Sequence, residues 1–260
     1  MDNHHNVQVQ YANSQNLDIR IAFQEKYSRN KYGFGPWLMD QYDFPANARV
    51  LEIGCGTGGM WLNRQELIDS FEELMLTDFS LGMLADAKKK LQHMHGIRFQ
   101  AADIRSLPFE DASYDFIIAN MMLYHVSDRE KAIAEVRCVL KPGGTFVCAT
   151  YGENNIVPYL KKQMEGILPM RDQNNNFTLQ NGGAQLEKQF AHVERRDYPD
   201  EFIVDDANAI IRYLTSMTNI VLAQGDCYSR ELLVAIMQSC IDAAGGQLRI
   251  AKEYGTFVCR

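Results

Sequence analysis

The residues whose spacing has the clearest chemical use are four glycines within six positions, in the run Gly54-Cys55-Gly56-Thr57-Gly58-Gly59. The run follows Val50–Ile53, a short apolar segment typical of a buried strand. Because glycine has no side chain, its backbone amides can approach a ligand closely and can adopt positive φ angles. A helix is expected to follow, and its free N–H groups favour a carboxylate or a nucleotide as the ligand.

The glycine spacing fits two cofactors. Gly54-x-Gly56-x-x-Gly59 matches the dinucleotide fingerprint, and Gly54-x-Gly56-x-Gly58 matches the pattern of S-adenosylmethionine (SAM) sites. Asp78 follows about twenty residues later, and either cofactor needs an acid to hold its ribose hydroxyls. The glycines alone leave both interpretations open. A tight turn without a ligand is disfavoured, because so many glycines weaken strands and helices.

The elements around this loop alternate between strand and helix. Five strand-like segments are expected, at 50–53, 74–77, 97–101, 115–119 and 145–149. Helical spacing of apolar residues predicts helices over 81–94 and 129–140. Alternation of this kind predicts right-handed crossovers and a parallel sheet that is covered on both faces.

The flanking segments predict a lid and a cap. Residues 1–44 are expected to form an N-terminal helical lid, and residues 45–260 the main domain with cap insertions near 152–182 and 205–245. A sixth strand is expected over 192–198, and a C-terminal antiparallel hairpin over 247–259. The lid aromatics Tyr27, Phe34 and Trp37 fit a flat apolar ligand, although packing of the cap onto the sheet is the preferred interpretation. Arg20 could meet an acidic group of the substrate or cofactor, although a surface position is the preferred expectation.

Composition narrows the functional classes. The formal net charge of −7 and the pI near 5.4 weigh against a nucleic-acid substrate, which is bound mainly through Lys and Arg. No apolar run is long enough to span a bilayer, and the polar segment 1–10 lacks the apolar core of a signal peptide. Six scattered cysteines without a CxxC pair predict reduced thiols, a cytoplasmic protein and no metal site.

Further motifs follow the glycine loop in a fixed order. They are Asp78-Phe79-Ser80-x-x-Met83-Leu84-x-x-Ala87, Ala102-Asp103-Ile104-x-x-Leu107-Pro108-Phe109, Tyr114-Asp115-Phe116-Ile117-Ile118, Leu123-Tyr124-His125-Val126 and Leu140-Lys141-Pro142-Gly143-Gly144-Thr145. Together with Val50–Gly58 they resemble the class I SAM-dependent methyltransferases over about a hundred residues. The resemblance is greatest to the small-molecule branch that includes the ubiquinone and menaquinone C-methyltransferases.

That resemblance implies a fold, a cofactor and a reaction. The expected fold is Rossmann-like α/β, a mostly parallel seven-stranded sheet with helices on both faces, plus helical cap segments. SAM would be the cofactor and S-adenosylhomocysteine the product, with no metal. The methyl acceptor would be an unidentified small molecule, attacked by in-line displacement.

The resemblance also assigns residues. The cofactor set is Glu52, Gly54, Cys55, Gly56, Gly58, Asp78, Phe79, Met83, Ala102, Asp103, Ile104 and Asn120. The glycines would line the methionine part, Asp78 would bind the ribose, and Asn120 would lie near the sulfonium. Asp103 would accept from the adenine amino group while the Ile104 N–H reaches a ring nitrogen. His125 is the candidate catalytic residue, as a general base.

Plainer roles stay open for several of these residues. Glu52 could accept from the cofactor ammonium or order the loop, and equally could be a buried acid bonded to backbone N–H groups. Phe79 and Met83 could be ordinary core residues, and His125 could only order a loop.

Two other functions also stay open. One is a non-catalytic SAM-binding regulator, because the binding motifs are clearer than the catalytic ones. The other is an NAD(P)-dependent oxidoreductase, which is disfavoured because Tyr159 and the lysines at 161 and 162 lack the Tyr-x-x-x-Lys spacing.

The ribose assignment is testable with Asp78→Ala. Loss of a carboxylate that accepts two hydroxyl hydrogen bonds should weaken SAM binding by about 1–3 kcal/mol and leave the fold intact. Calorimetric titration with SAM measures the change. Unchanged affinity would show that Asp78 is not the ribose acceptor.

Overall fold

The computed structural model describes residues 15–217, 221–222 and 228–260, and a seven-stranded sheet forms its centre, in the order β3-β2-β1-β4-β5-β9-β6. The strands are β1 (Arg49–Ile53), β2 (Glu73–Asp78), β3 (Ile97–Ala101), β4 (Tyr114–Asn120), β5 (Leu140–Tyr151), β6 (Val193–Tyr198) and β9 (Tyr254–Cys259). Strands β1 to β5 are parallel, and β9 runs antiparallel between β5 and β6. Within the described segments no helix has the length and apolarity needed to cross a membrane.

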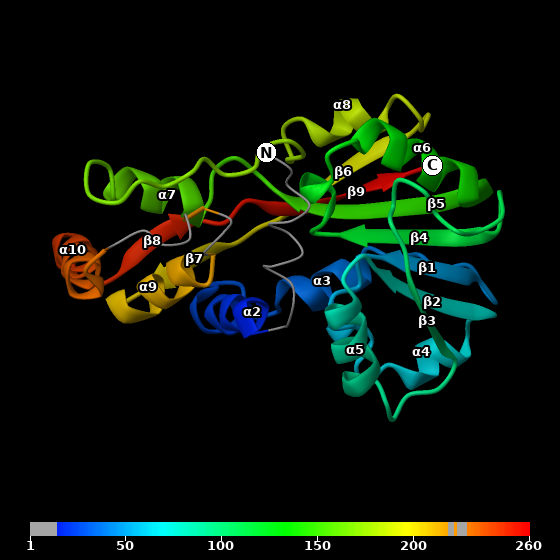
Figure 1. The fold of residues 1–260 in the computed structure, drawn as a ribbon, viewed down its shortest axis with the longest axis horizontal. Helices are drawn as coiled ribbons and strands as arrows, with labels where there is room; N and C mark the ends of the chain where they lie inside the picture. The colour runs from blue at the N-terminus through cyan, green and yellow to red at the C-terminus, as the bar shows by residue number, and fades with distance from the viewer. Residues whose placement is uncertain (1–14, 218–220, 223–227) are drawn as a thin grey trace.

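Helices cover both faces of this sheet (Figure 1). On one face lie α3 (Phe34–Asp40), α4 (Gln65–Asp69) and α5 (Leu81–Lys90), and on the other α6 (Arg129–Val139) and α8 (Gly182–Leu186). Apolar residues at helical spacing give α6 one buried stripe, and Asp128 caps its first turn by accepting from the Lys131 N–H at 3.1 Å. Because both faces are covered, β1 is buried on both sides, and only its first residue, Arg49, is not fully buried.

A second lobe extends from the end of the sheet (Figure 1). It consists of a two-stranded arm, β7 (Glu201–Val204) with β8 (Leu248–Ala251), and the helices α7 (Ile156–Gln163), α9 (Ala207–Thr215) and α10 (Arg230–Ala243). Helix α2 (Gln15–Tyr27) contacts α9 and β7, and its Phe23 and Tyr27 join the apolar core of this lobe. The lobe therefore has its own buried cluster, to which the N-terminal helix contributes.

The expected fold class is confirmed, and two details differ. The C-terminal antiparallel pairing joins β6–β7 to β8–β9, whereas the sequence suggested a local hairpin over 247–259. Strand β8 pairs with β7, while β9 pairs with β5 and β6, because β8 and β9 follow one another in the same register past a break at 252–253 and so do not fold back on each other. The helix expected after the glycine loop is also short: one 3-10 turn, Gly59–Trp61, and then the five residues of α4.

The lid aromatics pack as the preferred interpretation predicts. Phe34 lies 5.3 Å from Tyr198 and 5.1 Å from Tyr254 between ring centroids, so it packs against the ends of β6 and β9. The surface position expected for Arg20 is wrong, since only 8% of this residue is exposed. Part of the predicted lid, residues 1–14, and part of the predicted cap, residues 218–220 and 223–227, lie outside the described residues.

A close approach between strands makes Gly255 a test of this packing. A Cβ at Gly255 would lie 2.5 Å from the Arg196 carbonyl oxygen on β6, so Gly255→Ala should lower the free energy of unfolding by about 1–3 kcal/mol. Gly183→Ala on α8 is the matched control, because its nearest atom would be 3.5 Å away, an ordinary contact. Urea denaturation of both variants measures the difference. Equal stability of the two variants would contradict the close approach of β6 to β9.

Candidate functional site

The glycine loop lies at the carboxyl edge of the sheet, where β1 lies between β2 and β4. The chain order of the strands reverses at this point, and open α/β sheets bind ligands in the crevice there. Gly54, Gly56 and Gly58 have φ angles of 74°, 57° and 67°, which side-chain-bearing residues rarely adopt, whereas Gly59 begins the 3-10 turn. The glycines with positive φ thus have the spacing of the SAM pattern.

Neighbouring segments press closely on this loop. A Cβ at Gly54 would lie 3.0 Å from Met122 Cγ, and one at Gly58 would lie 2.7 Å from Leu91 Cδ1. A Cβ at Gly56 would lie 4.0 Å from Leu17 Cδ2, at the start of α2. The loop is therefore enclosed by the segment after β4, by the residue after α5, and by the N-terminal helix.

Asp78 ends β2 and holds the glycine loop. Its carboxylate accepts from the Gly56 N–H at 2.9 Å and from the Ser80 N–H at 2.8 Å. Burial raises the pKa of this carboxyl, and the backbone hydrogen bonds oppose the rise. A carboxylate has about four acceptor positions, so ribose hydroxyls can still bind at the remaining ones. Asp78 thus orders the glycine loop at the carboxyl edge of the sheet.

Glu52 at the end of β1 accepts a hydrogen bond from an indole. Its Oε2 accepts from Trp61 Nε1 at 2.5 Å, and only 3% of the residue is exposed. Burial raises the pKa of Glu52 to about 7, and the Trp61 bond only partly offsets this effect. The hydrogen-bond partner of Glu52 is therefore the Trp61 indole, a side chain of the 3-10 turn. It is not one of the backbone N–H groups that the buried-acid interpretation suggested.

Asn120 ends β4 beside this loop. Its Nδ2 donates to the Tyr42 hydroxyl at 2.6 Å, while its buried Oδ1 has no hydrogen-bond partner among the residues that the structure describes. The next residue, Met121, has a φ of 52°, which is rare for a residue with a side chain and turns the chain sharply after the strand. A buried acceptor without a partner costs free energy, so this atom suits a ligand that donates a hydrogen bond.

The residues expected near the adenine differ in their exposure and in their hydrogen-bond partners. Phe79 is 42% exposed and available to a ligand, whereas Met83 is 1% exposed and packed in the interior. Asp103 is engaged by Arg105, whose Nη2 lies 2.6 Å from Oδ2, so an adenine amino group would share this carboxylate with Arg105. Ala102 and Ile104 are buried beside it.

Two observations concern nucleophiles and metal ligands. Cys55 is buried within the loop, and burial raises the pKa of its thiol, so it stays protonated. In the chain segments that the structure describes, no three His, Cys, Asp or Glu side chains gather as a metal site requires.

His125 lies in a 3-10 turn, Leu123–His125, after β4. Burial, and to a smaller degree the charge of Arg20, lower the pKa of His125 to about 4. Its ring lies 4.4 Å from that of Tyr124, which in turn lies 4.5 Å from Tyr151 at the end of β5. The imidazole is therefore neutral at physiological pH and lies beside the Tyr124 ring.

Sequence reasoning missed several residues at this edge. Trp61, Tyr42 and Tyr151 reach the site through packing between distant segments, and no spacing in the chain indicated their roles. Lys90 was also missed, and its Nζ donates to Thr57 Oγ1 at 3.0 Å across the loop.

Comparison with known proteins gives a consistent assignment. Residues 51–148 match the family model of a methyltransferase domain. A demethylmenaquinone methyltransferase of Staphylococcus haemolyticus is 30% identical over 143 residues, which are 55% of this chain and 56% of that protein. The polyketide synthase-like protein Preu9 of Preussia isomera is 36% identical over 122 residues, 43% of this chain and 6% of that protein. The matched segment thus spans about half of the first relative and a small part of the second.

Solved structures agree in fold. The YcgJ protein of Bacillus subtilis has a TM-score of 0.58 at 19% identity, covering 86% of this chain and 96% of that one. A SAM-dependent methyltransferase from Aquifex aeolicus has a TM-score of 0.51 at 14% identity, covering 70% of this chain and 89% of that one. The fold and the glycine loop define a Rossmann-like α/β protein. The family model covers residues 51–148, so this part of the chain is a methyltransferase domain.

The buried Glu52 carboxyl predicts a pH dependence of stability. Its pKa is about 7 in the folded protein against an ordinary value of 4.5, so the cost of ionising it is absent below pH 4.5 and complete above about pH 7. Glu52→Gln should therefore gain stability relative to the unsubstituted protein as the pH rises from 5 to 8, by at most about 3 kcal/mol. Denaturant unfolding at several pH values measures this. Glu66→Gln, on an exposed α4 side chain, is the control, and parallel curves for both variants would contradict the assignment.

Proposed function

We propose that this protein transfers a methyl group from SAM to a small-molecule acceptor. The observation that carries the proposal is the glycine loop with positive φ at 54, 56 and 58, held by the Asp78 carboxylate through the Gly56 N–H at 2.9 Å. The dinucleotide fingerprint uses its third glycine, here Gly59, for close packing of helix on strand, but a Cβ at Gly59 would have its nearest atoms at an ordinary contact distance of 3.9 Å.

The residues of the crevice suit the parts of SAM. Backbone amides of the glycine loop would face the methionine carboxylate, because no Cβ obstructs them. The partnerless Asn120 Oδ1 and the Glu52 carboxyl offer acceptors for the methionine ammonium. Asp78 would accept from the ribose hydroxyls, and the exposed Phe79 ring would lie against the adenine.

The chain's contribution to the reaction would be alignment. SAM supplies a methyl group bonded to a sulfonium sulfur. When a nucleophile attacks the methyl carbon in line, the sulfur leaves as a neutral thioether. Alignment of two reactants can supply about 7–11 kcal/mol of barrier lowering, so the protein needs mainly to hold the acceptor and exclude water. His125 would take the proton of an acceptor that arrives protonated, since its neutral imidazole can accept one.

The flanking segments would form the acceptor side. We assign residues 1–44 as a lid, and the insertions near 152–182 and 205–245 as the cap of the domain 45–260. The position of α2 supports this assignment, because Leu17 lies near the glycine loop and the Arg20 charge acts on His125. The acidic balance favours a small molecule over a nucleic acid, and the scattered cysteines favour a cytoplasmic location.

Binding and turnover experiments separate this proposal from its rivals. Calorimetric titration with SAM and with NADH should give heat only with SAM, and tight NADH binding without SAM binding would favour an oxidoreductase. A screen of quinone, phenol and amine acceptors for release of S-adenosylhomocysteine should then identify turnover. Cofactor binding without release against any acceptor would favour a non-catalytic SAM-binding regulator.

The proposed base role of His125 has its own test. Once an acceptor is found, His125→Gln should lower kcat by about 10²-fold, within the range for loss of a general base, with SAM affinity unchanged. Because a base acts only when unprotonated, the acid limb of the kcat profile should lie near pH 4 rather than 6.5. A variant with unchanged kcat would assign His125 to ordering the loop.

A further inference from the structure

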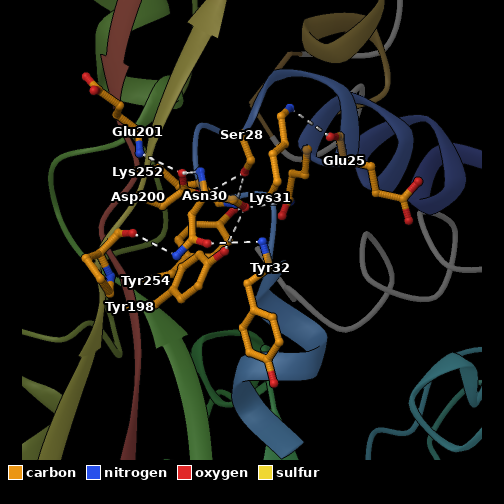
Figure 2. Close-up of polar contacts among 12 residues, drawn as sticks. Glu25, Ser28, Asn30, Lys31, Tyr32, Tyr198, Asp200, Glu201, Lys252 and Tyr254 are labelled. Atoms are coloured by element: carbon orange, nitrogen blue, oxygen red, sulfur yellow. Dashed lines mark hydrogen bonds and ion pairs between the residues drawn. The ribbon is translucent and has the colours of Figure 1, made fainter.

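A buried ion pair lies where the sheet continues into the arm of the second lobe (Figure 2). Lys252 Nζ lies 2.8 Å from Asp200 Oδ2, and the two side chains are 2% and 0% exposed. Lys252 also donates to Ser28 Oγ at 2.6 Å, and Ser28 donates to Asp200 at 2.6 Å. Each of these three side chains contacts the other two, and we call the group the latch.

Aromatic rings enclose the ammonium of the latch. Its Nζ lies 5.4, 5.1 and 5.1 Å from the ring centroids of Tyr198, Phe202 and Tyr254. A cation over the faces of aromatic rings is attracted by their quadrupoles, most strongly where water is excluded. The Lys252 ammonium is therefore stabilised by one carboxylate, one hydroxyl and three aromatic rings.

The latch joins three segments that are far apart in the sequence. Asp200 lies in the break between β6 and β7, and Lys252 in the break between β8 and β9, at the same level of the paired strands. Ser28 directly follows α2, and the Asn30 N–H donates to Asp200 Oδ1 at 2.9 Å. The Arg29 N–H donates to the Glu201 carbonyl at 2.9 Å, so the chain after α2 is fastened to the arm along several residues.

Helix α2 connects the latch to the proposed reaction site. It covers Gln15–Tyr27, and a helix of that length spans roughly 20 Å. Gln24 near the latch donates to the Tyr254 hydroxyl at 3.3 Å. Further along, the charge of Arg20 acts on His125, and Leu17 lies near Gly56. A shift of the end of α2 would therefore move Leu17 and Arg20 relative to the glycine loop and His125.

We propose that Lys252 is a positioning residue, which fixes α2 through Asp200 and Ser28 and so holds the other end of this helix, at Leu17, beside the glycine loop. The inference rests on the proposed function. Burying a charge pair costs desolvation that its attraction repays only with good geometry, and apolar residues of similar size often give equal or greater stability. A role in placing one element against another accounts for this pair better than stability alone.

The test uses variants of the latch and the titration of His125. Lys252→Met alone would leave Asp200 buried without its partner and could prevent folding, so the double variant Lys252→Met/Asp200→Asn removes both charges. Ser28→Ala is a milder variant that keeps both charges and removes the hydroxyl between them. Arg249→Met is the matched control, because Arg249 makes an exposed pair with Glu201 on the same arm, with side chains 64% and 24% exposed.

Proton NMR of the imidazole, assigned with His125→Gln, reports the placement of α2 without SAM or an acceptor. In the folded double variant the charge of Arg20 should act less on His125, so the pKa of His125 should rise from about 4 toward its ordinary value of 6.5. Ser28→Ala should shift it in the same direction by less, and Arg249→Met should leave it unchanged.

Two results would overturn the proposal. One is a folded double variant, or a folded Ser28→Ala variant if the double variant does not fold, in which His125 titrates as in the unsubstituted protein. The other is an equal shift in Arg249→Met. Failure of the unsubstituted protein to bind SAM would instead defeat the proposed function and leave the titration result intact.

Discussion

The Gly56 N–H donates to the Asp78 carboxylate across the edge of the sheet, and the site is built around this bond. A loop with three positive φ angles has no regular hydrogen-bond pattern of its own, so it needs an external acceptor to keep one conformation. Asp78 provides that acceptor because parallel pairing places the ends of β1 and β2 side by side. The same carboxylate lies at the carboxyl edge of the sheet, so the group that orders the loop also presents acceptors to a ligand.

Burial decides the charge of the other groups in the crevice. Glu52 has a pKa of about 7 and His125 one of about 4, in both cases first because burial disfavours the charged form. The imidazole is therefore neutral near physiological pH, and the Glu52 carboxyl is partly protonated and partly ionised. A binding ligand that carries an ammonium would favour ionisation of Glu52, which links cofactor binding to proton release.

The second lobe reaches the site through one helix. Helix α2 packs its Phe23 and Tyr27 in the core of that lobe, and its other end lies beside the glycine loop. The breaks in both long strands allow Asp200 and Lys252 to turn inward at one level, where they hold the chain that follows α2. The proposed acceptor side is thus assembled from segments that are far apart in the sequence.

The sequence by itself determined the parallel strands, the glycine loop and Asp78, because these depend on local patterns: apolar runs, glycine spacing and an acid at a strand end. It also indicated that Phe34 and its neighbours pack the lid. Only the tertiary structure decided the partners of Glu52 and Asn120, the burial of Arg20, and the pairing of β8 with β7. The ion pair of Lys252 with Asp200 belongs with these. Each depends on contacts between segments tens to hundreds of residues apart or on the shortened helix after Gly59, and no local periodicity encodes such contacts.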